Sequence, residues 1–163
     1  MNTQTLADRS ESALLNLKRI LVPTDFSESS NSAYKYALRL AQQFCAELHV
    51  IHVLEPVLSA QFAGPPEKQA ISNKELASVE EELRAWADSV EAMGVTANMV
   101  LRNGLPAHEI VEAAKDIDID LIVIASLGFT GWKHFCIGST AERVVRAAPC
   151  PVLVVREREH QFA

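Results

Sequence analysis

A glycine-bearing stretch at 125–139 contains the residues best suited to hold an anion. It follows the apolar run 120–125 and leads into 140–147, which has helical spacing, so the pattern predicts a strand, a loop and a helix start. Glycine lets the backbone approach a bound group closely, and a helix's first turn presents free N–H groups. Gly138 and Ser139 would therefore offer a phosphate amide donors and a hydroxyl. The spacing of Ser139 and Glu142 fits a capping box equally well, and spacing alone does not separate the two interpretations.

Asp25 is a second candidate, because it follows the apolar run Arg19–Pro23 directly after Thr24. Its carboxylate could bind a ribose hydroxyl or a metal ion carried by phosphates. It could also form an Asx turn just ahead of Ser27, which is a good N-cap for the helical segment that follows.

The sequence contains none of the catalytic patterns G-x-S-x-G, H-E-x-x-H and the P-loop. His49 and His52 lie three residues apart in a predicted strand, so they point to opposite faces and cannot share a metal. We expect them to be packed or edge histidines. Nothing in these residues demands catalysis.

Composition and charge exclude several classes of partner. A chain of 163 residues, 48% hydrophobic and 22% charged, suits one globular domain with a full core. A net charge of −6 argues against a non-specific nucleic-acid or acidic-membrane surface, and no segment is apolar enough to span a bilayer. Three cysteines without a C-x-x-C pair predict a reduced, cytosolic protein with buried free thiols: Cys45, Cys136 and Cys150.

Apolar periodicity predicts alternating strands and helices. The expected strands are Arg19–Pro23, Glu47–Leu54, 96–101, Leu121–Ala125 and Val152–Val155. The expected helices are Glu28–Phe44, 73–93, 106–117 and 140–147. Residues 1–17 and 158–163 read as tails, with one domain at 18–157, and 57–72 reads as an exposed insertion.

This alternation predicts an α/β fold, in which a doubly wound parallel sheet of five strands carries helices on both faces. Ligands of such sheets bind at the carboxyl ends of the strands, where the strand order reverses. With the order 3-2-1-4-5, the loops after Pro23 and Ala125 would open into one crevice.

These segments together resemble the universal stress protein family, in its nucleotide-binding branch. The resemblance covers about residues 18–156 and is carried by the runs 20–27, 48–53, 102–106, 128–143 and 149–155. The family's ATP-binding pattern is G-x-x-G, nine residues, then G-S or G-T. Gly128 and the pair Gly138-Ser139 match it, whereas Ala125 stands at the first glycine and Leu127 stands where many relatives carry a basic or imidazole side chain.

The resemblance implies an adenine nucleotide alpha hydrolase-like fold that binds ATP, or AMP, ADP or cAMP, with Mg or Mn accompanying the nucleotide. It implies that ribose and adenine are lined by Pro23, Thr24 and Asp25, and that adenine meets the backbone of Val53. Phosphates would be held by Gly128, Gly138, Ser139 and Thr140, with Ala125 alongside. It also implies a homodimer in which Val152 to Val155 pairs with its dyad mate, and an unpaired apolar edge strand favours this on physical grounds.

Three functions remain open at this point. The first is a nucleotide-binding stress or regulatory protein whose protein partners the sequence does not identify. The second is a slow ATP hydrolase that uses Asp25 and a metal, and the third is a ligand-free dimeric interaction module. We expect Ala125→Gly to tighten ATP binding if the loop is a phosphate cradle.

Overall fold

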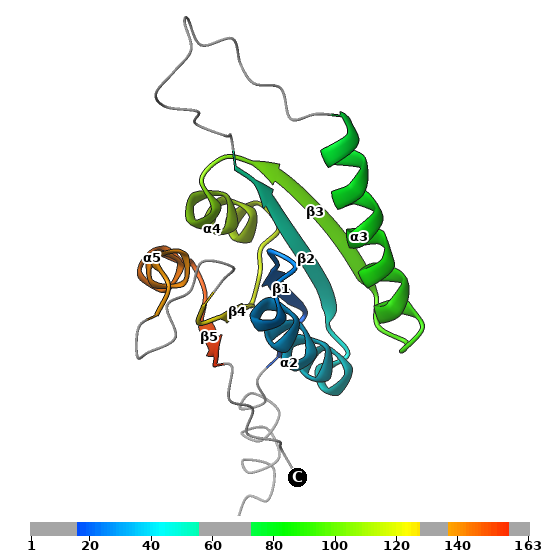
Figure 1. The fold of residues 1–163 in the computed structure, drawn as a ribbon. Helices are drawn as coiled ribbons and strands as arrows, with labels where there is room; N and C mark the ends of the chain where they lie inside the picture. The colour runs from blue at the N-terminus through cyan, green and yellow to red at the C-terminus, as the bar shows by residue number, and fades with distance from the viewer. Residues whose placement is uncertain (1–15, 56–72, 128–136, 157–163) are drawn as a thin grey trace, which may run out of the picture.

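The computed structural model describes residues 16–55, 73–127 and 137–156, and within them it contains one parallel sheet (Figure 1). The strand order is β3-β2-β1-β4-β5, so the predicted topology is confirmed. The strands are β1 (Arg19–Pro23), β2 (Glu47–Leu54), β3 (Ala97–Asn103), β4 (Leu121–Ala125) and β5 (Val152–Val155).

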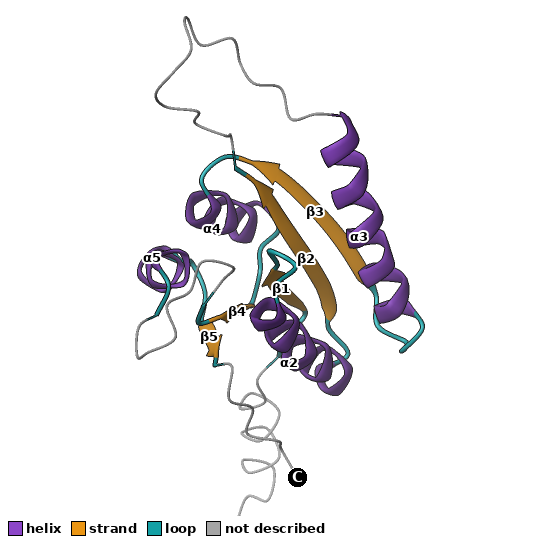
Figure 2. Ribbon diagram, in the orientation of Figure 1, coloured by secondary structure: helices purple, strands orange, loops and turns teal. Residues whose placement is uncertain are grey.

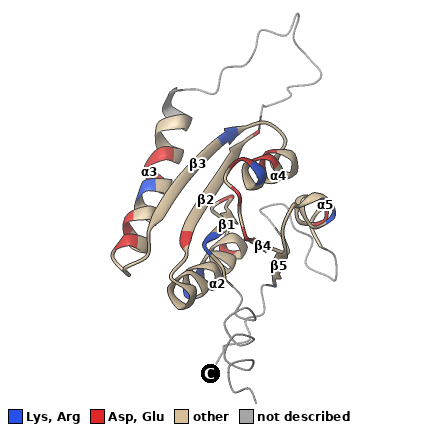
Figure 3. Ribbon diagram, turned by 180° about the vertical axis from the view of Figure 1, so that it is seen from behind, with Lys and Arg blue, Asp and Glu red and all other residues tan. Residues whose placement is uncertain are grey.

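Helices cover both faces of the sheet, as predicted (Figure 2). They are α2 (Glu28–Phe44), α3 (Asn73–Glu91), α4 (Pro106–Asp116) and α5 (Ser139–Ala147). One core cluster joins α2 and α3 to the sheet, and the other joins α4 and α5 to its opposite face. Charged residues lie on the helices and near the strand ends, which leaves the middle of the sheet without them (Figure 3). In the described part of the chain, no helix is long and apolar enough to cross a membrane.

Local signals in the sequence account for where the helices begin and end. The side chain of Ser27 accepts a hydrogen bond from the backbone N–H of Ser30, so the predicted N-cap of α2 is confirmed. Pro106 begins α4, where its missing N–H costs nothing. Gly94, with φ +77°, follows α3 in the left-handed conformation that glycine tolerates best.

Several predicted boundaries need small corrections. The third strand runs from Ala97 to Asn103 instead of from residue 96 to 101, because it stays in register with β2 from Leu48↔Ala97 to Leu54↔Asn103. The helix α5 begins at Ser139, one residue earlier than predicted. The helices α3 and α4 end at Glu91 and Asp116, one or two residues earlier than predicted. Such differences of one or two residues are usual where helix ends fray.

The prediction of buried thiols is wrong for Cys45, which is exposed because it ends α2 in the left-handed conformation, at φ 53°. Cys150 is half-buried, and Cys136 lies outside the described residues.

The seam between β1 and β4 is short. All five residues of β1 pair with β2, but only Ile20 and Leu21 pair with β4. The N–H of Thr24 donates to Ile51 on β2, so the backbone nitrogen of Pro23 faces the β4 side. Because proline has no N–H, it cannot extend the ladder there, and the two strands part at their carboxyl ends.

Candidate functional site

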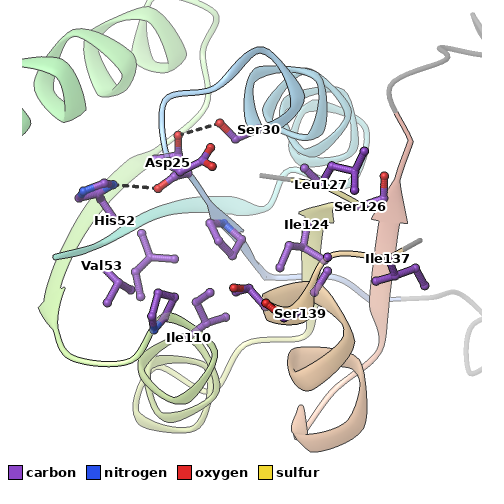
Figure 4. Close-up of a pocket in the computed structure, with 18 of the residues that line it drawn as sticks. Asp25, Ser30, His52, Val53, Ile110, Ile124, Ser126, Leu127, Ile137 and Ser139 are labelled. Carbon is purple, nitrogen blue, oxygen red and sulfur yellow. Dashed lines mark hydrogen bonds between the residues drawn. The ribbon is translucent and has the colours of Figure 1, made fainter. Parts of the chain in front are cut away.

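A cavity of about 460 Å³ lies where β1 and β4 part. Its walls come from the carboxyl ends of β1, β2 and β4 and from the beginnings of α4 and α5 (Figure 4). The cavity brings together all of the predicted site residues that the structure describes: Pro23, Thr24, Asp25, Val53, Ala125, Gly138, Ser139 and Thr140. Gly128 lies outside the described residues.

Thr24 fixes the turn between β1 and α2. Its N–H donates to the carbonyl of Ile51 at 2.8 Å, and its hydroxyl lies 3.2 Å from that of Ser30. The hydroxyl oxygen also accepts the backbone N–H of Phe26 at 2.9 Å. Thr24 is only 6% exposed, so these bonds hold the turn rigidly at the cavity wall.

Asp25 makes the Asx turn that the sequence offered as one alternative. Its Oδ1 accepts the backbone N–H of Ser27 at 3.1 Å and the Ser27 hydroxyl at 2.6 Å. The residue also lines the cavity, so its structural role leaves it beside any ligand. Binding of ribose or metal by Asp25 stays a prediction.

His52 lines the cavity, a role that the sequence did not indicate. Its Nδ1 lies 2.8 Å from the carbonyl oxygen of Thr24, which can only accept, so Nδ1 carries a proton and donates (Figure 4). Its ring stacks on Phe26, with centroids 4.7 Å apart. His49 belongs to the opposite face, as predicted from the alternation of strand residues.

The helix α5 begins differently from a capping box. Its N-cap is Gly138, which has no side chain, and Ser139 is the first helical residue. Glu142 pairs instead with Arg146 at 2.9 Å, one turn further on. The capping-box interpretation of Ser139 and Glu142 is therefore wrong, and the Ser139 hydroxyl faces the cavity without a capping role.

Gly138 also ties the start of α5 to the end of β4. Its N–H donates to the carbonyl of Ser126 at 2.7 Å, and a Cβ added at Gly138 would meet that same oxygen at 3.3 Å. Such a close backbone approach explains the need for glycine here. The first turn of α5 therefore lies at the cavity. The N–H groups and the dipole at the N-terminus of a helix attract anions.

Ala125, at the position of the absent glycine, is 8% exposed and belongs to the core cluster on the α2 side. Its neighbour Ile124 belongs to the opposite cluster. Both residues border the cavity, but the Ala125 methyl also packs in the core. Leu127 borders the cavity too, and offers a phosphate no charge.

The charged side chains at the cavity are acidic. Asp25 and Glu55 line it, and none of the described lining residues is Lys or Arg. Across the described ranges, no group of three or more His, Cys, Asp or Glu is arranged to hold a metal. Of the described residues, those that could bind an anion in this cavity offer backbone N–H groups, hydroxyls and the α5 dipole.

Other residues of the wall were not singled out in the sequence. Pro106 and Ile110 come from the beginning of α4, Ile51 and Ile137 are also apolar, and Ser30, Ser126 and Ala141 line the cavity too. The sequence carried no signal for α4, since its apolar stripe predicts core packing alone.

Comparisons with known proteins agree with this fold. The sequence profile of the universal stress protein family matches residues 16–156. Universal stress protein MJ0531 of Methanocaldococcus jannaschii is 38% identical over 143 residues, or 86% of this chain and 82% of that protein. Universal stress protein UspA from Lactobacillus plantarum is similar in structure, with a TM-score of 0.77 and 28% identity over 88% of this chain and 100% of that one.

Two more distant structures share the fold. One is a universal stress protein in complex with cAMP, with a TM-score of 0.66 and 23% identity over 86% of this chain and 98% of that one. The other is a universal stress protein from Archaeoglobus fulgidus in complex with dAMP, with a TM-score of 0.64 and 20% identity over the same shares, 86% and 98%. Since the family profile spans most of the sequence, and the M. jannaschii protein aligns over most of both chains, this chain belongs to the universal stress protein family.

Proposed function

We propose that this protein binds an adenine nucleotide, with ATP as the expected ligand, and acts as a cytoplasmic regulatory protein of the stress response. The observation that carries the proposal is that one cavity combines apolar walls with the start of a helix. Val53, Pro106 and Ile110 are among its apolar residues, and Gly138, Ser139 and Thr140 line it at the start of α5. A nucleotide likewise combines a largely apolar base with charged phosphates.

The apolar walls of the cavity suit adenine. A planar base gains free energy by leaving water for apolar walls, and backbone groups beside Val53 can satisfy its polar edge. The relatives solved with cAMP and dAMP hold ligands that share this base and differ in the sugar and the phosphate. Recognition of adenine in this chain is consistent with those complexes.

The start of α5, which lines the same cavity, suits phosphates. Ser139 and Thr140 supply first-turn N–H groups and two hydroxyls, beside Gly138, whose own N–H is bound to Ser126. Asp25 lines the same cavity and would bind the ribose. Because no described lining residue is cationic, a divalent ion such as Mg or Mn would accompany the phosphates and offset their charge. The protein residues then orient the ligand, and we assign them no hydrolytic step.

The edge strand β5 supports the proposed homodimer. β5 pairs with β4 on one side only, and Leu153 on this strand is 39% exposed. Pairing of Val152 to Val155 with its dyad mate would cover this edge. Sedimentation should show a dimer for the wild type and a monomer for Leu153→Lys, and an unchanged dimer would place the interface elsewhere.

Isothermal titration with ATP, ADP, AMP and cAMP tests nucleotide binding. We expect ATP to bind with measurable heat and to raise the unfolding temperature, because a ligand that binds only the native state stabilises it. Mass spectrometry of gently purified protein gives an independent readout, as a co-purifying nucleotide would exclude the ligand-free module. No heat and no stabilisation with any of the four would refute the proposal.

A further inference from the structure

Four aromatic rings form a continuous line that runs from the cavity wall through α3 to α2. His52 stacks on Phe26 with centroids 4.7 Å apart, Phe26 meets Trp86 edge-on at 6.0 Å, and Trp86 lies 4.4 Å from Tyr34. These contacts join β2, the β1–α2 turn, α3 and α2. His52 borders the cavity, whereas the other three rings are not among its lining residues. We call this line the aromatic row.

The aromatic row holds a residue in a costly backbone conformation. Phe26 has φ 61°, in the left-handed region that a bulky side chain rarely adopts. Such a conformation persists only where the surroundings determine it. Its ring is held between His52 and Trp86, and its N–H donates to the Thr24 hydroxyl.

His52, the first ring of the aromatic row, also contacts the β1–α2 turn through a hydrogen bond. His52 Nδ1 donates to the carbonyl of Thr24 at 2.8 Å. Thr24 and Asp25 line the cavity directly. The backbone that would face the ligand is thus fixed by a hydrogen bond on one side and by ring stacking on the other.

We infer that His52 and Phe26 are positioning residues for the nucleotide site, and that Trp86 of α3 supports them from outside it. The inference rests on the proposed nucleotide binding. Its consequence is that ligand affinity depends on how α3 packs, although α3 contributes no residue to the cavity lining. By thermodynamic reciprocity, a bound nucleotide would also stabilise the packing of α3.

Trp86→Leu removes the ring of α3 from the row without touching the cavity lining. We expect the ATP Kd to rise at least about fivefold, in the range that an aromatic pair contributes, while Trp86→Phe recovers most of the affinity. Leu83→Ala is the matched control, since Leu83 is a core residue of the same helix, 2% exposed, and makes none of the ring contacts above.

Urea unfolding of each variant separates positioning from general destabilisation. Leu83→Ala should lower stability at least as much as Trp86→Leu and leave the ATP Kd within about twofold of wild type. Wild-type affinity in Trp86→Leu would overturn the inference. An equal loss of affinity in Leu83→Ala would also overturn it, because the effect would then follow stability alone.

Hydrogen exchange of the ligand-free protein distinguishes this inference from the proposed function. Trp86→Leu should speed exchange at the amides of Phe26 and Ser27 more than Leu83→Ala does, since the row holds that turn. If wild type binds no nucleotide, the proposed function fails. The comparison of exchange rates between the two variants then still tests whether the aromatic row holds the turn. Equal exchange in the two variants would show that the row does not fix the turn.

Discussion

The N–H of Gly138 lies 2.7 Å from the carbonyl oxygen of Ser126, so the first turn of α5 is fastened to the end of β4. Gly138→Ala would place a Cβ 3.3 Å from that oxygen, while its φ of −60° suits alanine. We therefore expect a small shift of the β4 end without backbone strain. Stability should fall by about 1 kcal/mol, as for mild overpacking, and the ATP Kd should rise about three- to tenfold. Titration and urea unfolding measure both, and an unchanged Kd would show that the fastening does not shape the site.

Ser139→Ala separates phosphate binding from helix capping. Because Gly138 is the N-cap, loss of the Ser139 hydroxyl should change stability by less than about 0.5 kcal/mol. A hydroxyl that donates to a charged phosphate contributes about 1.5–3 kcal/mol, so the ATP Kd should rise at least about tenfold. Ser139→Thr, which keeps the hydroxyl, is the control. A clear loss of stability with unchanged affinity would return this residue to a purely structural role.

Ala125→Gly tests the position of the absent glycine. The sequence led us to expect tighter ATP binding, but the methyl packs in the core cluster on the α2 side. We now expect stability to fall by about 1 kcal/mol, from the lost methyl and the added backbone freedom. Affinity should stay within about threefold of wild type, a difference of about 0.7 kcal/mol. Titration would show tightening well beyond that if the methyl hinders the ligand instead.

The buried imidazole of His49 predicts how stability depends on pH. Burial lowers the pKa of His49 below its ordinary value, and the carboxylate of Glu47, 3.4 Å away, opposes this only in part. Between the lowered folded pKa and the unfolded value of about 6.5, the unfolded chain binds more protons. The free energy of unfolding should therefore fall as pH drops below about 6.5.

Urea unfolding on both sides of about pH 6.5, in wild type and in His49→Gln, isolates this contribution. The variant should lose less stability on acidification than wild type does. Glu47→Gln should lose more, because it removes the charge that favours the protonated ring. Identical pH dependence in all three proteins would contradict the assignment to His49.

The arrangement of elements could be predicted from sequence because its signals are local. The strand Glu47–Leu54 is a nearly continuous apolar run, and Ser27 caps α2 with its own side chain. The end of β3 was missed because it depends on pairing with β2, which lies far away in the sequence. Local pattern and tertiary pairing thus determine different parts of the fold.

The site was only partly predictable for the same reason. Asp25 and Ser139 follow strands at positions that the fold class makes functional. Of the two interpretations of Ser139 that the sequence left open, the capping box is wrong because the helix begins at Ser139 itself, a shift of one residue that spacing cannot show. The contact between His52 and Thr24 joins β2 to the turn after β1 and has no counterpart in the spacing of either segment.

The short seam between β1 and β4 sets a trade-off between stability and function. Pro23 lacks the donor that would extend the ladder beyond Leu21, and one such hydrogen bond would contribute about 0.5–1.5 kcal/mol. A longer ladder between β1 and β4 would make the sheet more stable and would leave less room between these two strands. The protein forgoes that bond, and the cavity lies at the end of this short seam.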